Sequence, residues 1–437
     1  MSSIHHVATE WPDSLWAAAT PAGPELPVLR GDHRCDVVVI GAGFTGLSTA
    51  LHLAGAGVDA VVVEAAEPGW GASGRNNGQV IPTLTRANPD DIVATHGEAG
   101  ERFVAVLRDS AQMLFDLAAT HGIDADAEQT GWAQPAHSPG RLRMSEIRVE
   151  QWRRWGAPVD LLDRDEMRRM TGSEAWHGGF WNRSGGHINP LAFARGLARA
   201  ALAVGARIFS HSPAVSFDRD GDAWIVRTPQ GSVRASSLVL ATNAYTDAFA
   251  PALAPSIARE IVPVLSWQMA TQPLADDVRA TILPGRQAMS DTHGDLHFAR
   301  YDARHRLVTG GALIASRNGA ERLRPVIAAR LQRLWPQIGD VTFDHVWNGA
   351  IAMTPDHLPR FHRIGPRGYA WAGCNGRAVA LSIAIGRKFA RAVQGVPDHD
   401  LALPFTEPRP LPAHGLLRRL APLMLLLYRR RDAREIA

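Results

Sequence analysis

The chain has 437 residues, of which 46% are hydrophobic and 20% are charged, a composition typical of a folded globular protein and not of a disordered one. Lys and Arg number 46 against 43 Asp and Glu, for a formal net charge of +3, and Lys388 is the only lysine. A mechanism that needs a lysine amine, such as Schiff-base chemistry, therefore has a single candidate residue, because arginine stays charged near neutral pH.

Residues 1–24 contain neither a basic stretch nor an apolar stretch of the kind found in secretory signals. The two cysteines, Cys35 and Cys374, do not make a disulfide framework and fit a reducing compartment. We therefore expect a cytoplasmic protein. Arginines are interleaved with acids along the chain, which argues against a nucleic-acid-binding face despite a pI of about 9.2.

Residues 35–64 read as strand, glycine-rich turn, helix and strand. A β-branched run over 36–40 predicts a buried parallel strand, and the turn after it has the spacing G-x-G-x-x-G. These glycines permit a tight turn, close approach of the backbone to a pyrophosphate, and close packing of the helix. An acid ends the second strand, 61–63, where it can accept hydrogen bonds from a ribose diol, and it disfavours NADP. The predicted dinucleotide-binding residues are Gly41, Ala42, Gly43, Phe44, Thr45, Gly46 and Glu64.

A loop rich in glycine, small and amide residues follows the second strand, reading GWGASGRNNGQV over 69–80. Such a loop leaves backbone N–H groups free and lets the chain approach a flat ring. Together with the turn before it, the loop resembles the D-amino-acid-oxidase superfamily of FAD-dependent amine oxidoreductases, specifically its γ-glutamylputrescine-oxidase-like branch. The resemblance implies FAD, contacted by Gly71, Ala72, Ser73, Gly74, Arg75, Asn76, Gly78 and Gln79.

The resemblance continues through the middle of the chain. Residues 186–206 resemble the family's helix before a third strand, and Pro190 and Gly205 suit the start and end of that helix. Residues 212–243 read as a β-meander. In the family, positions like Val215 and Ala241 contact the cofactor. Asn243 stands where the family's turn usually has glycine.

Two segments of the last third, 348–356 and 372–380, are similar to the family's flavin-edge segments. The second leads into a helix that runs through Lys388, whose N-terminus can stabilise negative charge on the flavin. Some relatives attach the flavin to a cysteine where this chain has Gly349, and others to a histidine in the loop 69–80, which has none. We therefore predict noncovalent FAD. The cofactor contacts implied here are Gly349, Asn375, Gly376, Arg377 and Ala378.

The predicted fold class is α/β, with a Rossmann-type FAD-binding domain and an interleaved α+β substrate domain built on a mixed β-sheet. The FAD-binding segments are 28–90, 185–250 and 347–405, and the substrate-domain segments are 91–184 and 251–346. Within the latter, 101–117 is an amphipathic helix. We find no second G-x-G-x-x-G linked directly to a strand, so a separate NAD site is not indicated. The chain has no C-x4-C pair, which excludes the disulfide-reductase type of flavoenzyme.

The sequence pattern predicts strands over residues 261–274 and 295–312, in a sheet that covers the flavin. In the family, this region supplies contacts to the substrate. Alternation places Phe298 and Arg300 on one face, and His297 and Tyr301 on the other, and either pair could be buried. Arg300 could hold a carboxylate bidentately or form a structural ion pair. The catalytic candidates are His297, Arg300 and Tyr301, and the substrate-binding candidates are Arg300, Tyr301, Trp267 and Asn348, with Gln268 weaker.

The resemblance implies oxidation of a C–N bond in an amine or amino acid, with a γ-glutamylputrescine-like compound or an N-substituted amino acid as substrate. Hydride would pass to flavin N5, leaving an imine that water hydrolyses. The alternatives are an FAD-dependent dehydrogenase of a 2-hydroxy acid or polyol, and a non-catalytic FAD-binding protein. Electrons would go to oxygen or to a quinone or protein carrier. Several sarcosine-oxidase relatives use a substrate-domain lysine for oxygen, and this chain has none there.

The tail, 406–437, contains a short apolar stretch between arginine clusters, LLRRLAPLMLLLYRRR over 416–431. It is shorter than the roughly 20 residues that span a bilayer. A helix docked on the body is favoured over a basic anchor lying on a membrane surface.

Overall fold

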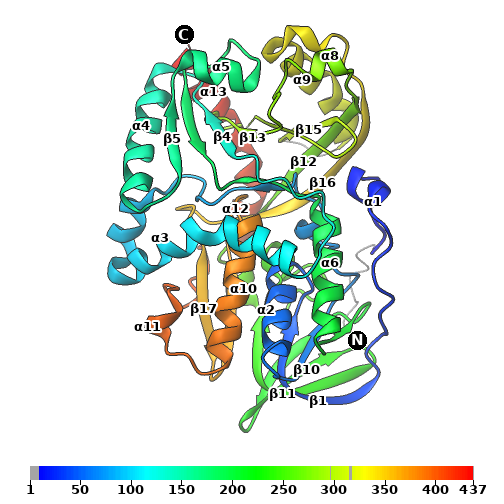
Figure 1. The fold of residues 1–437 in the computed structure, drawn as a ribbon. Coiled ribbons are helices and arrows are strands. Elements are labelled where there is room, and N and C mark those ends of the chain that lie inside the picture. Colours follow the sequence, from blue (N-terminus) through cyan, green and yellow to red (C-terminus); the bar gives the residue numbers. More distant parts are fainter. Residues whose placement is uncertain (1–8, 296, 314–316, 437) are drawn as a thin grey trace.

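The computed structural model describes residues 9–295, 297–313 and 317–436 (Figure 1). Its first large sheet lies in the lower half of Figure 1 and has a parallel centre. The strands in order are β17 (Arg360–Gly365), β18 (Gly368–Ala372), β11 (Gly231–Leu240), β1 (Gly31–Ile40), β2 (Ala60–Val63) and β8 (Arg207–Phe209), with β10 (Ala223–Thr228) and β9 (Ser216–Asp220) added beside β11.

The first sheet contains the predicted strand, helix and strand around the glycine-rich turn. β1 pairs in parallel with both β2 and β11, and β9 to β11 form the predicted meander. β1 begins at Gly31, earlier than predicted, because its exposed first residues pair with the start of β11, which the apolar pattern does not reveal. Three helices with buried faces cover this sheet: α2 (Phe44–Ala54), α6 (Pro190–Ala203) and α10 (Val379–Val393).

The second large sheet lies in the upper half of Figure 1 and is mixed, since β13 pairs in parallel with β4 while its other neighbours pair antiparallel. We call it the roof sheet. Its strands in order are β16 (Phe343–Met353), β12 (Val262–Pro273), β15 (Arg306–Gly311), β14 (Phe298–Tyr301), β13 (Ala288–Ser290), β4 (Trp132–Pro135), β6 (Gly179–Asn182) and β5 (Val159–Leu162). Within the predicted segment 295–312, of which residue 296 lies outside the described residues, β14 and β15 form a hairpin, whose turn is held by N–H groups that donate to the Asp302 carboxylate.

The largest helix of the upper half is α3 (Pro89–Thr120), which crosses between the two sheets and bends at Gly97 (Figure 1). It contains the predicted amphipathic helix, in which Phe103, Val106, Leu107 and Leu114 are buried and Leu117 is half-buried. The other helices are α1 (Leu15–Ala19), α4 (Pro139–Arg154), α5 (Arg164–Thr171), α7 (Pro255–Ala258), α8 (Asp276–Arg279), α9 (Gly319–Leu334), α11 (Asp398–Leu401), α12 (His414–Leu420) and α13 (Met424–Ile436).

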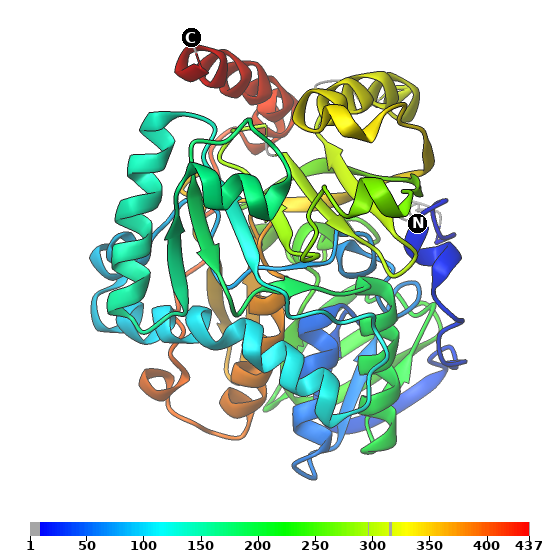
Figure 2. The same ribbon diagram turned by 45° about the horizontal axis from the view of Figure 1, so that its top comes forward.

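Short elements complete the chain: a two-stranded sheet of β3 (Gln79–Val80) and β7 (Gly186–His187), and the 3-10 turns η1 (Ala72–Gly74), η2 (Asn243–Tyr245), η3 (Pro336–Ile338) and η4 (Ala421–Leu423). Figure 2 shows the tail helix, in red, along the outer edge of the upper half. None of the helices within the described ranges has the length and apolarity to cross a membrane.

The chain passes back and forth between the two sheets, which confirms the predicted α/β class with its mixed second sheet. The first sheet takes strands from 31–63, 207–240 and 360–372, and the roof sheet takes them from 132–182 and 262–353. β16 continues as one strand through the predicted domain boundary at 346–347.

Candidate cofactor site

The turn between β1 and α2 requires glycine at positions 41 and 46 and favours it at position 43. Gly41 has a φ of +103°, in the left-handed region that L side chains avoid. A Cβ on Gly46 would lie 1.9 Å from the backbone oxygen of Gly41, and one on Gly43 would lie 2.9 Å from Ser73 Oγ. The N–H of Phe44, the first residue of α2, donates to Ser73 Oγ at 3.0 Å, whereas Gly43 offers no side-chain cap to the N–H groups that follow, which leaves those groups available to an anion.

Glu64 follows β2 at the same edge of the sheet. Its carboxylate accepts hydrogen bonds from the backbone N–H groups of Ala42, at 2.6 Å, and Ala66, at 3.0 Å. Burial raises the pKa of the Glu64 carboxyl, and these two N–H groups act in the opposite direction. The carboxylate is thus fixed beside the turn, where its remaining lone pairs can accept hydroxyl hydrogen bonds.

A cavity opens above this turn. The predicted cofactor residues that line it are Gly41, Ala42, Gly43, Phe44, Thr45, Glu64, Gly71, Ala72, Ser73 and Ala241. The prediction missed other lining residues, among them Trp70, Thr242, Asn243, Tyr245, Phe249 and Trp371. The ATNAYT motif pointed to this turn but did not show which of its side chains face the cavity.

Asn243 stands where the family's turn usually has glycine, and its backbone lies in the left-handed region that glycine adopts readily. Its φ is +44°, and asparagine tolerates the left-handed region better than most residues. Its side-chain oxygen accepts the N–H of Gly373 at 3.0 Å, which joins the turn after β11 to the segment before α10.

The predicted cofactor residues outside the cavity lining are Gly46, Gly74, Arg75, Asn76, Gly78, Gln79, Val215, Gly349, Asn375, Gly376, Arg377 and Ala378. Gly46 and Gly74 provide close packing, since a Cβ on Gly74 would lie 2.5 Å from the backbone oxygen of Gly69. The N–H of Val215 donates to the backbone oxygen of Arg227 at 2.8 Å. Any contact from Val215 to a cofactor would therefore use its carbonyl or its side chain.

The loop 69–80, β16 and the start of α10 meet beside the cavity. Trp347 Nε1–H donates to the backbone oxygen of Arg75 at 2.8 Å, and the N–H of Ala350 donates to Tyr245 Oη at 3.0 Å. A Cβ on Gly349 would lie 3.2 Å from Arg75 Cβ. The segments predicted to border the flavin are therefore adjacent, although they come from opposite ends of the sequence.

The start of α10 is arranged around Asn375. Its side-chain oxygen accepts the N–H of Thr354 at 2.9 Å, and its Nδ2 donates to the backbone oxygen of Gly373 at 2.8 Å. Ala378 precedes the first helical residue and makes no side-chain cap, so the first N–H groups of α10 are unpaired.

Arg377 extends away from this helix start into the core. Its Nη1 donates to Thr83 Oγ1 at 3.2 Å and to the backbone oxygen of Leu84 at 3.1 Å, and the guanidinium lies 4.7 Å from the ring centre of Trp132. Burial, with the charge of Arg148, holds the pKa of Arg377 well below its usual value. Its side chain is a structural element, whereas its backbone remains next to Gly376 at the helix start.

The pairing of the strands decides which face of the roof sheet looks toward the first sheet. Gln268 lies opposite Gly310 and Trp347, and Trp347 contacts the loop 69–80. Trp267 lies opposite Gly311 and Asn348, and a Cβ on Gly319 of α9 would lie 2.3 Å from the Trp267 ring. Because neighbouring residues point to opposite faces, Gln268 faces the cofactor side and Trp267 faces α9.

This register disfavours substrate contact for two predicted residues, Trp267 and Asn348, which share the face toward α9. Tyr301 lies on that face as well: its hydroxyl donates to the backbone oxygen of Ile282 at 3.0 Å, within the core against which α9 packs. Alternation in the sequence shows which residues share a face, but only the pairing between distant strands shows where that face looks.

His297 lies in a stack of histidines beside α13. Its ring lies 4.2 Å from that of His293, which lies 3.9 Å from that of His137. Asp291 accepts from His293 Nδ1 at 2.6 Å, and its carboxylate lies 3.1 Å from His297 Nδ1. This cluster joins the roof sheet to the tail, so the geometry favours a structural role for His297.

Arg300 is on the cofactor side of the roof but is already fully engaged in holding the chain. It is 1% exposed, its Nε, Nη1 and Nη2 donate to the backbone oxygens of Asn77, Tyr301 and Ile188, and it lies over the ring of Trp16. A bidentate carboxylate would have to displace these bonds. The arrangement therefore disfavours Arg300 as a substrate anchor.

Three buried glutamine side-chain oxygens of the described residues lack a hydrogen-bond donor, those of Gln79, Gln268 and Gln287, and the first two belong to segments near the cofactor side. Gln79 Nε2 donates to the backbone oxygen of Met289, and Gln268 Nε2 donates to Ser266 Oγ, but neither Oε1 has a partner among the described residues. Leaving a buried acceptor unpaired costs about 1–3 kcal/mol. Neither glutamine lines the cavity above the turn, but Gln268 lies on the roof face toward the loop 69–80, where a bound molecule can supply the missing donor. The glycine turn and Glu64 fit the pyrophosphate and ribose of FAD.

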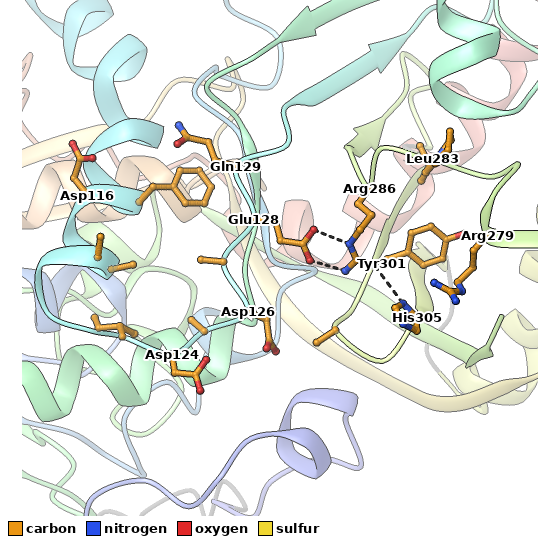
Figure 3. A pocket seen from close by; sticks show the side chains of 18 of the residues that line it. Asp116, Asp124, Asp126, Glu128, Gln129, Arg279, Leu283, Arg286, Tyr301 and His305 are labelled. Carbon is orange, nitrogen blue, oxygen red and sulfur yellow. Dashed lines mark hydrogen bonds and ion pairs between the residues drawn. The ribbon is translucent and has the colours of Figure 1, made fainter. Parts of the chain in front are cut away.

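A second, wider cavity of about 1160 Å³ lies outside this region (Figure 3). It is lined by the end of α3, the loop 122–129 and residues near α8. Figure 3 shows Arg286 paired with Glu128, at 2.6 Å, across its wall. None of the glycine-turn residues lines it, so the chemistry of nucleotide binding belongs to the smaller cavity above the turn.

Comparison with known proteins agrees with this geometry. The family model for FAD dependent oxidoreductases, DAO, matches residues 36–392. The γ-glutamylputrescine oxidoreductase of Escherichia coli (strain K12) is 30% identical over 389 residues, which cover 89% of this chain and 90% of that protein.

Solved structures share the fold at lower identity. L-amino acid deaminase from Proteus vulgaris has a TM-score of 0.72 at 18% identity and covers 91% of this chain and 99% of its own. Glycine oxidase from Geobacillus kaustophilus has a TM-score of 0.69 at 20% identity and covers 83% and 95%. The sequence match, the fold and the glycine turn together lead to one conclusion: the chain belongs to the DAO family of FAD-dependent oxidoreductases.

Proposed function

We propose that this flavoenzyme oxidises the C–N bond of an amine, and that its substrate is a γ-glutamylputrescine-like compound. The observation that carries the proposal is the cofactor-side face of the roof sheet, where Gln268 presents an unpaired amide oxygen and the nearby arginine is engaged by backbone carbonyls. The full-length similarity to γ-glutamylputrescine oxidoreductase supports the same reaction class.

We assign the holding of FAD to three groups of residues. The turn from Gly41 to Gly46 would bind the pyrophosphate, and Glu64 would accept the ribose hydroxyls. The predicted residues of the loop 71–79, with Gly349 and the start of α10 at residues 375–378, would border the ring, where unpaired N–H groups favour negative charge. The chemistry that FAD supplies when bound is acceptance of a hydride from the carbon next to the substrate nitrogen.

The residues of the chain then bind and orient the substrate. An N–H of the substrate amine would donate to Gln268 Oε1, which fixes the nitrogen and leaves its lone pair free. The roof sheet would exclude water while the C–H bond breaks. The amine loses a hydride and a proton to become an imine, and water then gives a carbonyl compound and a released amine. Positioning carries this reaction, so no side-chain base is required.

The engaged arginines favour an amine without a carboxylate next to the reacting carbon. Arg300 and Arg377 both donate to groups of the chain itself, and a carboxylate near either one would have to compete with those bonds. An amine at the end of a neutral carbon chain meets no such conflict. The engaged arginines therefore favour a γ-glutamylputrescine-like substrate over an N-substituted amino acid.

Anaerobic bleaching of the flavin tests this proposal. We expect γ-glutamylputrescine-like amines to bleach the yellow enzyme faster than N-methyl amino acids, polyamines without a γ-glutamyl group, or 2-hydroxy acids, with release of an amine or ammonia. Bleaching by a 2-hydroxy acid alone would support the alcohol dehydrogenase alternative, and no bleaching by any compound would support a non-catalytic flavoprotein.

Attachment of the flavin is a separate question. Gly349 offers no sulfur, so we propose noncovalent FAD, and acid precipitation should leave the yellow chromophore in the supernatant. Yellow colour in the precipitated protein would contradict this proposal.

A further inference from the structure

The helical tail of the chain has its polar side chains turned inward and its apolar side chains turned outward. The large hydrophobic residues that stay exposed in this segment are Leu416, Leu417, Leu420, Leu423, Met424, Leu426 and Leu427. Of the leucines in α13, only Leu425 is buried. A helix that merely packs on a soluble protein shows the reverse pattern, because burial of its apolar face is what holds it there.

The inward contacts of α13 are ionic. Arg141 donates to both carboxylate oxygens of Glu435, at 2.7 and 2.8 Å, and His137 lies 3.1 Å from the same group. The N–H of Gly294 donates to Asp432, which is 4% exposed. These bonds fix the rotation of α13 about its axis, and that rotation exposes its leucines.

α12 is held in the same way. Arg418 donates to Asp247 at 2.7 Å, and His414 Nε2 lies 2.8 Å from the backbone oxygen of Ile261. Each of the seven exposed side chains on α12, η4 and the start of α13 has another of the seven three or four residues away, as in the series 416, 420, 423 and 427, so they lie on one broad side of the helical segment. We call the seven exposed residues the tail patch.

The surroundings of the tail patch are positively charged. Residues 408–431 contain no Asp or Glu, whereas arginines occur at 409, 418, 419 and 429–431. Arg419 and Arg430 are exposed and form no hydrogen bond or ion pair with the described residues. A patch of leucines beside unpaired arginines matches the chemistry of an anionic bilayer surface, in which acyl chains accept the leucines and phosphates accept the guanidinium groups.

We propose that the tail patch binds the surface of a bilayer that contains anionic phospholipid, and that it holds the enzyme there without spanning the membrane. A second copy of the chain would bury the same leucines, but it would bring the arginines of both copies together. The unpaired positive charge therefore favours the lipid surface over self-association.

Sedimentation of the flavin-loaded enzyme with lipid vesicles tests this proposal. We expect the full chain to bind vesicles of phosphatidylcholine mixed with phosphatidylglycerol and to bind pure phosphatidylcholine much more weakly. Added salt should weaken the binding, because the arginine contribution is screened. Absence of binding to the mixed vesicles, or equal binding to both kinds, would overturn the proposal.

Two variants and a matched control locate the contact. The double variant Leu423→Asp with Leu427→Asp should lower vesicle binding by about tenfold or more, since two leucines no longer enter the acyl region. Arg419→Gln with Arg430→Gln should lower binding to the mixed vesicles by about fivefold for each arginine lost. Ile147→Asp with Val204→Asp, at side chains that are 53% and 37% exposed and lie outside the tail, should leave vesicle binding unchanged.

Two further measurements distinguish loss of lipid binding from misfolding and from self-association. Flavin content and thermal unfolding should match the wild type in all three variants, because the altered side chains are on the surface. Light scattering should show no concentration-dependent dimer. A dimer that is lost in the Leu423→Asp, Leu427→Asp variant, without vesicle binding by the wild type, would assign the tail patch to self-association and overturn the proposal.

Discussion

At the scale of single residues, Gln268 and Trp267 are neighbours with opposite environments. Gln268 has a buried amide oxygen without a donor on the cofactor side of the roof, whereas Trp267 packs against α9. Composition and motif do not distinguish them, and the larger aromatic side chain is the more obvious candidate for a substrate pocket. They differ because neighbouring residues of β12 point to opposite faces of the roof sheet.

We predict that Gln268→Leu lowers kcat/KM for the amine by about tenfold to a hundredfold while FAD remains bound, because one hydrogen bond to the substrate nitrogen is lost. Thermal stability should stay the same or rise, since the variant also removes an unpaired buried acceptor. Stopped-flow reduction of the flavin measures the effect. Trp267→Phe is the control and should leave the reduction rate unchanged; an equal rate in Gln268→Leu would contradict the role.

Gly46 shows a steric requirement that one added methyl group would violate. A Cβ there would lie 1.9 Å from the backbone oxygen of Gly41, within the turn that we assign to the pyrophosphate. We predict that Gly46→Ala destabilises the fold by about 1–3 kcal/mol and yields protein depleted of FAD. Denaturant unfolding and the flavin-to-protein absorbance ratio test this. Gly415→Ala, where a Cβ meets nothing within 4 Å, should behave as the wild type.

At the scale of elements, the attachment of α13 to the roof sheet depends on ionisable groups. His137 is 2% exposed at its side chain, and burial, with the neighbouring His293, lowers the pKa of His137 to about 4. In the unfolded chain the pKa of histidine is near its ordinary value of 6.5. Between these values the unfolded state binds a proton that the folded state excludes, so stability falls as the pH falls.

We predict that the free energy of unfolding decreases between pH 6.5 and pH 4, and that His137→Phe reduces this decrease by up to about 3 kcal/mol, because a phenyl ring keeps the stacking but binds no proton. Urea unfolding of both proteins across this pH range measures the difference. Parallel curves for the two proteins would show that His137 does not titrate on unfolding.

At the scale of the whole molecule, the arginine-rich composition and the tail patch both bear on which acceptor reoxidises the reduced flavin. The chain has no lysine between residues 1 and 387, and Lys388 lies half-buried on α10, beyond the helix start that we place at the flavin. The roof sheet therefore has no counterpart of the substrate-domain lysine that the family resemblance links to the reaction with oxygen. A tail on a bilayer surface would place the enzyme beside membrane quinones.

We predict that photoreduced enzyme reacts slowly with oxygen and faster with a soluble quinone, because the charge that stabilises superoxide is missing. Mixing the anaerobic reduced enzyme with each acceptor and following the return of the yellow colour measures both rates. Rapid single-phase reoxidation by oxygen would instead identify an oxidase, and Lys388→Met would then test whether that lysine contributes.

Much of the fold was predictable from the sequence because its signals are local. The spacing of Gly41, Gly43 and Gly46 follows from steric limits within one turn, and the acid at the end of β2 lies within the same short unit. The cofactor, the α/β class and the mixed second sheet were predicted from these residues and from the family resemblance, and they are confirmed.

The substrate face and the tail were decided by the tertiary structure alone. Alternation around residues 297–301 shows which side chains share a face of the strand but not where each face looks. The pairing of β12 with β15 and β16 shows which of the two faces looks toward the first sheet. The tail pattern predicted a helix, but the rotation that turns its leucines outward depends on Glu435 meeting Arg141 and His137, nearly three hundred residues away. The sequence by itself determined the dinucleotide turn and, with the family resemblance, the cofactor and the fold class, since these signals lie within short segments. Contacts between distant segments decided which side chains of the roof sheet lie on the face toward the first sheet and which side chains of the tail are exposed.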